Sequence, residues 1–73
     1  MGSKDIKIRS DEEFITLQSL LKMTNIISTG GMAKIFLAEE EVLVNDEPEN
    51  RRGRKLYPGD VIQVSGQVFR IKK

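Results

Sequence analysis

The sequence predicts a small α+β fold, in which a helical hairpin packs on a small, mainly antiparallel sheet. Three observations predict it. Apolar residues between positions 14 and 37 recur at the spacing of helices that bury one face. From position 41 onward the pattern switches to the period of two that is typical of strands. Turn-forming residues then divide this second half into short segments.

One strand and two helices are expected in the N-terminal half. Residues 4–8 alternate isoleucine with charged residues, which predicts a half-buried strand at the edge of the sheet. The Ser-Asp-Glu-Glu run at 10–13 has the form of a capping box, so a helix is expected to begin there and to end near Met23. After a link of about five residues, the Ser-Thr pair at 28–29 is expected to cap a second helix that ends near Glu39.

The C-terminal half is expected to form strands joined by tight turns. Strands are predicted at residues 41–45, 61–64 and 67–71. The Asn-Asp-Glu-Pro run at 45–48 is a turn by composition, and Pro58-Gly59-Asp60 is another, because proline fixes φ and glycine accepts a positive φ. Ser65-Gly66 is predicted to be a tight hairpin turn.

Length and composition exclude several classes of function. A chain of 73 residues is one domain, over 1–73, with a minimal core and no room for a deep substrate cleft. Cysteine and histidine are both absent, which removes disulfides, thiolate chemistry, the usual zinc sites and a histidine base. We therefore expect no enzyme, no catalytic residue, no metal, no cofactor and no small-molecule substrate. With no apolar run long enough to span a bilayer and no signal peptide, we expect a cytoplasmic monomer without a membrane partner. Residues 1–3 are expected to be flexible or left over from cloning.

A cluster of positive charge lies between two of the expected strands. Residues 51–55 read Arg-Arg-Gly-Arg-Lys, four cations in five residues on a chain whose net charge is only +1. An arginine guanidinium matches a phosphate with two parallel hydrogen bonds. Arg51, Arg52, Arg54 and Lys55 are therefore candidate contacts to a nucleic-acid backbone. The alternative is a solvated loop whose charge only keeps the chain soluble.

Three further features are candidate contacts, each with a structural alternative. Glycines at the start of a helix destabilise it by roughly 1 kcal/mol each, so Thr29, Gly30 and Gly31 suggest a turn whose amides can touch a phosphate, with Lys34 one helical turn further on. The alternative is close packing of this turn against the first helix. Asn45 can hydrogen-bond a nucleotide or, as we favour, satisfy backbone groups at its own turn.

Aromatic residues are too few to form a row that stacks successive bases. The chain has one tyrosine and no tryptophan, and Phe14, Phe36 and Phe69 are expected in the core. This argues against a reader of single strands and favours recognition of folded RNA by shape and backbone.

Together these residues resemble the S4 RNA-binding domain family. Val42-Leu43-Val44-Asn45 is similar to its V-x-V-N motif, and Pro58-Gly59-Asp60-Val61-Ile62 is similar to its closing P-G-D-x-I. Leu20-Leu21-Lys22 resembles its leucine pair with a following basic residue, and Ala33 its second-helix alanine. The resemblance covers about residues 14–64 and is strongest to the small stand-alone bacterial proteins of the YaaA type. It implies an S4-like (αL) fold, binding to structured RNA, plausibly ribosomal, and a role in ribosome biogenesis.

The chain also departs from that pattern. The family usually has Arg where Gly30 stands and Gly where Glu40 stands, and often Arg and Asp in place of Thr16 and Gln18. One usual cation is thus missing from the helical face. Binding is then assigned to two lysines of the helices, Lys22 and Lys34, together with the backbone amides of residues 30 and 31 and the loop at 51–55.

Two other functions stay open. The run from Val44 through the P-G-D turn also resembles the β-grasp sulfur-carrier proteins, but those end in Gly-Gly, whereas this chain ends Ile71-Lys72-Lys73. The acidic segment at 39–49 is the candidate surface of a protein-interaction adaptor.

Overall fold

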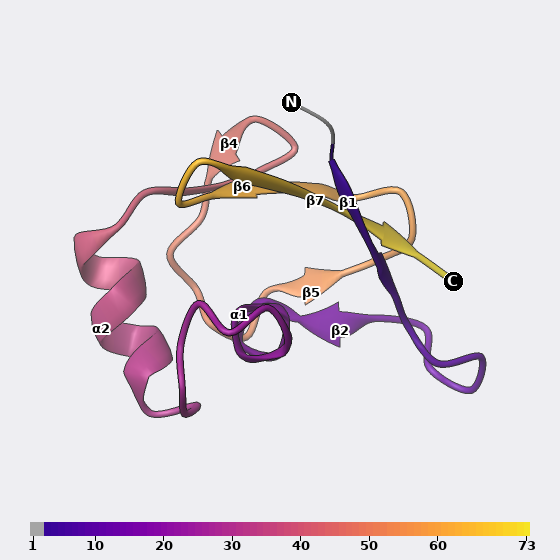
Figure 1. The fold of residues 1–73 in the computed structure, drawn as a ribbon, viewed down its shortest axis with the longest axis horizontal. Coiled ribbons are helices and arrows are strands. Elements are labelled where there is room, and N and C mark those ends of the chain that lie inside the picture. The colour runs from indigo at the N-terminus through magenta and orange to yellow at the C-terminus, as the bar shows by residue number, and fades with distance from the viewer. Residues whose placement is uncertain (1–2) are drawn as a thin grey trace.

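Two sheets and two helices surround a shared apolar core in the computed structural model, which describes residues 3–73 (Figure 1). Strand order in the larger sheet is β1-β7-β6-β3-β4. These strands are β1 (Lys4–Lys7), β7 (Gln67–Lys72), β6 (Val61–Val64), β3 (Val42–Val44) and β4 (Glu47–Pro48). Only the β1–β7 pairing is parallel among the strands of residues 3–73. The predicted α+β class and the mainly antiparallel sheet are confirmed. The expectation for residues 1–3 falls mostly on Met1 and Gly2, which lie outside the described residues.

Period-two alternation gives the larger sheet one buried face. Val44 pairs with Ile62, and Ile62 pairs with Phe69, so three apolar side chains form a row across the strands. All three are at most 1% exposed. The residues between them in sequence, such as Gln63 and Arg70, point to the outer face. The strands predicted at 4–8, 61–64 and 67–71 are thus placed within a residue of their observed bounds.

The first helix begins later than its capping signal indicates. The segment at 10–13 forms a turn, and β2 (Ile15–Thr16) follows it and pairs with β5 (Lys55–Leu56) in a second, two-stranded sheet. Helix α1 (Leu17–Met23) starts only after this pairing. Its N-cap is Thr16, whose Oγ1 accepts a hydrogen bond from the Ser19 amide at 3.2 Å. The expected capping box at 10–13 is therefore wrong, because burying Ile15 in the ladder opposite Leu56 keeps this part of the chain extended.

The second helix also begins later than expected. Helix α2 (Met32–Glu39) has Gly31 as its N-cap, without a side-chain capping bond, and it ends where predicted. The link after α1 is residues 24–31, longer than the expected five. Figure 1 looks down the axis of α1, whereas α2 lies across the view, so the helices cross steeply. Neither helix of residues 3–73 has the length and apolar character needed to cross a membrane.

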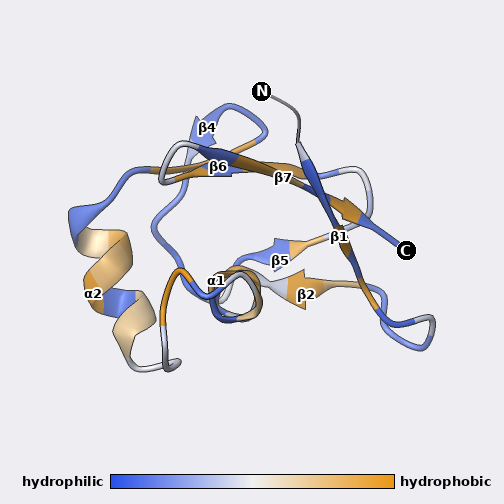
Figure 2. Cartoon of the chain, viewed as in Figure 1, coloured by the Kyte–Doolittle hydropathy of each residue, from blue (hydrophilic) through white to orange (hydrophobic). Residues whose placement is uncertain are grey.

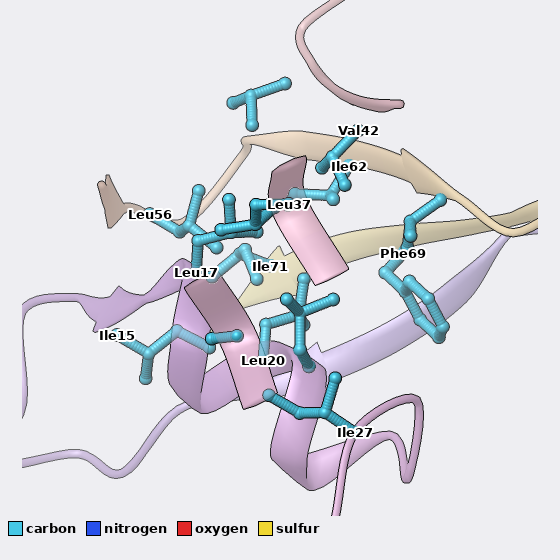
Figure 3. Close-up of a cluster of buried hydrophobic side chains, with 14 of the residues drawn as sticks. Ile15, Leu17, Leu20, Ile27, Leu37, Val42, Leu56, Ile62, Phe69 and Ile71 are labelled. Carbon is cyan, nitrogen blue, oxygen red and sulfur yellow. The ribbon is translucent and has the colours of Figure 1, made fainter. Parts of the chain in front are cut away.

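The core fills the space between the larger sheet and the layer formed by α1 with β2 and β5 (Figures 1 and 3). Leu17, Leu20 and Leu21 of α1 are fully buried, as is Leu56 of β5. In Figure 3 side chains from both layers point toward one another, with Leu17, Leu56 and Ile71 close together. The β2–β5 pair is thereby held against the core.

Two hairpin turns use the left-handed backbone region. Asn45 and Asp46 have φ of 53° and 67° between β3 and β4, and Ser65 and Gly66 have 52° and 74° between β6 and β7. Two consecutive positive φ values are typical of the tight turns that match the twist of a hairpin. The predicted Ser65-Gly66 turn is confirmed. The turn predicted at 45–48 is confined to residues 45 and 46, because Glu47–Pro48 forms β4. The Asn45 side chain also ties this turn to β6. Its Nδ2 donates to Asp60 Oδ1 at 3.1 Å, and its Oδ1 accepts from the Val61 backbone amide at 3.0 Å.

We expect Asn45→Ala to destabilise the protein more than Asn25→Ala. Both asparagines have positive φ, 53° and 61°, so both substitutions carry the same backbone penalty. The Asn25 side chain makes no hydrogen bond with another residue of 3–73, so only Asn45→Ala also removes side-chain bonds. Urea denaturation should give a difference of about 1–2 kcal/mol in the free energy of unfolding. Equal losses would mean that the Asn45 side chain contributes nothing beyond its backbone.

Candidate nucleic-acid interface

The basic loop, residues 51–54, joins β4 to β5 and lies against the start of α1. Figure 2 shows the chain from β4 toward α1 as a hydrophilic segment. The Leu17 amide donates to the Arg54 carbonyl at 2.9 Å, and the Gln18 amide donates to the Arg52 carbonyl at 3.0 Å. The first amides of a helix have no partner within the helix. Here the loop supplies partners to two of them, so the loop backbone is fixed to α1.

A buried carboxylate organises the side chains of this loop. Glu49 is 9% exposed. Its Oε2 accepts from the Arg51 Nε at 3.0 Å and from the Arg51 amide at 3.1 Å. Its Oε1 accepts from the Arg51 Nη2 at 3.1 Å and from the Arg54 Nη1 at 2.7 Å. The hydrogen bond from the Arg51 side chain, aided by that from Arg54 and opposed by burial, lowers the pKa of Glu49 to about 2. The same bond raises the pKa of Arg51 above its ordinary value.

The three cations of the basic loop and the adjoining Lys55 of β5 therefore fall into two kinds. Arg51 and Arg54 are bound to Glu49, although the Arg51 side chain is still 72% exposed. Arg52 and Lys55 are exposed and are not bound to Glu49. Sequence reasoning placed Glu49 in a separate acidic segment and missed this contact. The available signal was a glutamate two and five residues before arginines, in a stretch that had to turn.

The Gly-Gly turn lies beside α1 as well. A side chain at Gly30 would meet the Gln18 side chain, whereas the Cβ of a side chain at Gly31 would make only an ordinary contact with Thr29 Oγ1, at 3.9 Å. Close packing, the structural alternative, thus accounts for Gly30. The amides of Met32 and Ala33 already donate to the carbonyls of residues 29 and 30, each at 3.1 Å. The sequence suggested that amides at this turn can contact a phosphate. In the structure these are limited to the amides of residues 30 and 31, which precede the helix.

Gln18 brings the predicted elements together. Its amide holds the loop at Arg52, and its side chain lies against Gly30, so the basic loop and the Gly-Gly turn flank one residue of α1. Lys22 stands one helical turn beyond Gln18 on the same side of α1 and is exposed. Thr29 and Lys34 are exposed too. Asn45 is a different case, because both ends of its amide are engaged within the sheet.

An aromatic pair that the sequence did not predict lies next to the basic loop. Phe14 was predicted in the core, but it is only half-buried and packs against Tyr57, with ring centroids 5.7 Å apart and ring planes at 48°. The Lys55 Nζ lies 5.1 Å from the centroid of the Phe14 ring. A hollow in the surface runs from this pair to the loop and is lined by Arg51, Gly53, Arg54, Lys55, Tyr57 and Asp60. The prediction for Phe14 is therefore wrong, while Phe69 is buried and Phe36 packs against the core.

Comparison with known proteins decides the family. The model of the S4 domain matches residues 6–72. The chain belongs to the S4 domain family. A protein of Bacillus subtilis (strain 168) named "Probable ribosome maturation protein RlbA" is 63% identical over 59 residues, which cover 81% of this chain and 83% of that protein. The predicted S4 family is confirmed, which favours it over the sulfur-carrier alternative.

We expect Glu49→Gln to lower the free energy of unfolding of this S4 domain by about 1–2 kcal/mol. The negative charge is lost, and one of the two acceptor oxygens becomes an NH2 group that cannot accept from the arginines. The matched control is Glu47→Gln, which makes the same charge change at an exposed neighbour and should have little effect. Urea denaturation at neutral pH measures both.

The effect of Glu49→Gln should also depend on pH in a defined direction. The pKa of Glu49 is lowered from 4.5 to about 2 by folding, so its charge contributes fully above about 4.5 and is lost as the pH falls toward 2. The stability difference between the wild-type and Glu49→Gln chains should shrink across that window. A difference that stays constant from neutral pH to pH 2 would contradict the assigned role of the Glu49 charge.

Proposed function

We propose that this S4 domain is a non-catalytic, monomeric, cytoplasmic RNA-binding protein of bacterial type, which binds structured ribosomal RNA during ribosome biogenesis. The observation that carries the proposal is the exposed cationic loop, which the backbone fixes to α1 beside the Gly-Gly turn. Membership of the S4 domain family supports RNA as the partner. The relative's name supports a ribosomal context, since the identity of 63% extends over most of both chains.

The proposed interface follows the RNA backbone. Arg52 and Lys55 would make the most direct phosphate contacts, because Glu49 does not hold them. Arg51 keeps most of its surface exposed beside them. Lys22 on α1 and Lys34 on α2 would extend the contact along the helical side. Thr29 and the amides of residues 30 and 31 remain proposed secondary contacts, and Asn45 a marginal one.

We expect Arg52→Glu to weaken binding to a folded ribosomal RNA fragment by about tenfold or more at moderate salt. Arg52 is preferred to Arg51 for this test, because replacing Arg51 would also strip Glu49 of its main partner. Lys4→Glu is the control, since it makes the same change in net charge on β1, at the opposite edge of the sheet from β4. Gel-shift titration measures the affinities, and thermal melting should show both variants folded, because surface changes usually shift stability by within about 0.5 kcal/mol.

Equal weakening by the two variants would mean that net charge alone governs binding. Unchanged binding by Arg52→Glu would remove the basic loop from the interface and overturn the proposed site.

We also expect folded RNA to bind more tightly than a single strand of the same composition, with steep dependence on salt. About five phosphate contacts predict a slope of about −3.5 to −4.5 for log K against log salt. Titrating a structured ribosomal RNA fragment, its unfolded counterpart and a poly-pyrimidine strand across a salt series gives both quantities. Tightest binding to the poly-pyrimidine strand with a shallow slope would contradict recognition by shape and backbone.

A further inference from the structure

The aromatic rings on the outer face of the β2–β5 pair have no role in the phosphate contacts described above. Ile15 pairs with Leu56, and both are buried against the core. Side chains alternate along a strand, so the neighbours of this pair point the other way. One position further along the same register, Phe14 stands opposite Tyr57, and in the other direction Thr16 pairs with Lys55.

We propose that Tyr57, supported by Phe14 and flanked by Lys55, is a stacking site for one unpaired nucleotide of a folded RNA. The inference rests on the proposed function and deepens it, because it names the structural feature that the RNA must present. That feature is a single bulged or looped-out nucleotide next to a helical segment.

The ring of Tyr57 is fixed and accessible. Tyr57 is 45% exposed, so one part of the ring is open to solvent while Phe14 packs against another part. Its backbone is held in the turn, since the Tyr57 amide donates to Asp60 Oδ2 at 2.8 Å. A stacking surface that is already ordered loses little conformational entropy when a base settles on it.

The charges around the ring suit a nucleotide. The Lys55 ammonium lies 5.1 Å from the Phe14 ring centroid, and Lys55 lines the same hollow as Tyr57. Arg51 and Arg54 line the same hollow, and Gly53 contributes no side chain that would fill it. The hollow's carboxylate, that of Asp60, is already engaged by the Tyr57 amide and by Asn45 Nδ2. A base on Tyr57 would thus have cations within reach of its flanking phosphates.

One ring pair selects one nucleotide. Proteins that bind single strands without sequence preference stack successive bases on a row of aromatic side chains. The chain has one tyrosine, no tryptophan, and its other two phenylalanines lie in or against the core. A single platform beside a cationic loop fits an unpaired nucleotide that interrupts a duplex. The alternative is a purely structural role, in which the Phe14–Tyr57 contact only stabilises the pairing of β2 with β5.

The test compares two RNA hairpins that differ only in a single-nucleotide bulge, bound to the wild-type, Tyr57→Phe and Tyr57→Leu chains. The wild type should bind the bulged hairpin about tenfold more tightly than the paired one, which is within the range for one stacked base. Tyr57→Phe should keep this ratio, because the ring remains. Tyr57→Leu keeps an apolar side chain without an aromatic face and should bring the ratio close to one, with no change in the salt slope for the bulged hairpin, because stacking releases no counterions.

Tyrosine emission gives an independent readout. Tyr57 is the one tyrosine of the chain and tryptophan is absent, so the emission reports on this site alone. At equal saturation of the protein, bulged RNA should quench the tyrosine emission more than paired RNA does. A parallel titration of free tyrosine amide corrects for the light that the RNA absorbs. Thermal melting shows whether each variant is folded, and the emission of the wild type tests the proposal even if Tyr57→Leu unfolds.

The possible outcomes separate the two proposals. If the wild type binds both hairpins alike and the emission does not distinguish them, the stacking site is wrong while RNA binding stands. If Tyr57→Leu is folded and keeps the preference for the bulge, Tyr57 only fastens the strands. If the wild type binds neither hairpin nor ribosomal RNA fragments, the proposed function fails and the stacking site fails with it.

Discussion

The candidate interface depends on the contacts of the Glu49 carboxylate with Arg51 and Arg54. Four cations in five residues repel one another, and a loop that carried them alone would extend into solvent. One buried carboxylate accepts hydrogen bonds from Arg51 and Arg54 and so draws both ends of the loop inward. With the loop turned inward, its carbonyls at Arg52 and Arg54 meet the first amides of α1. A single acidic side chain thereby makes a charged loop part of the folded structure.

This arrangement separates the cations that shape the loop from those that are exposed for a ligand. Arg51 and Arg54 form ion pairs with Glu49, whereas Arg52, between them in the sequence, and Lys55, directly after them, do not. A rigid backbone matters for an interface that follows phosphates, because the spacing of phosphates on folded RNA is fixed by the RNA. A mobile loop of equal charge would bind extended and folded RNA alike. The order of the loop therefore bears on selectivity for shape, and the number of its charges bears on affinity.

Local patterns predicted the features that are determined locally. The turns at Asn45 and Ser65 follow from residues that tolerate positive φ, and the strands around them follow from alternation. The β2–β5 pair could not be predicted this way, since each strand has two residues and they join positions that lie forty residues apart in sequence. That pairing overrode the capping box at 10–13 and moved the helix start to Leu17. It also turned Phe14 outward. Glu49 was missed for a different reason, because its contacts with Arg51 and Arg54 are local in sequence but depend on how the chain turns between residues 49 and 54.

The resemblance to the S4 pattern predicts an arginine at residue 30, where this chain has glycine. Gly30 packs so closely on Gln18 that a side chain at residue 30 would displace the Gln18 side chain. Gln18 in turn holds the loop through its amide. Gln18 thus joins α1, the Gly-Gly turn and the basic loop. Positive charge is then concentrated in the loop and on Lys55, next to the outward-facing rings of Phe14 and Tyr57. The part of the fold that local patterns could not reveal is therefore also the part where the proposed RNA contacts lie.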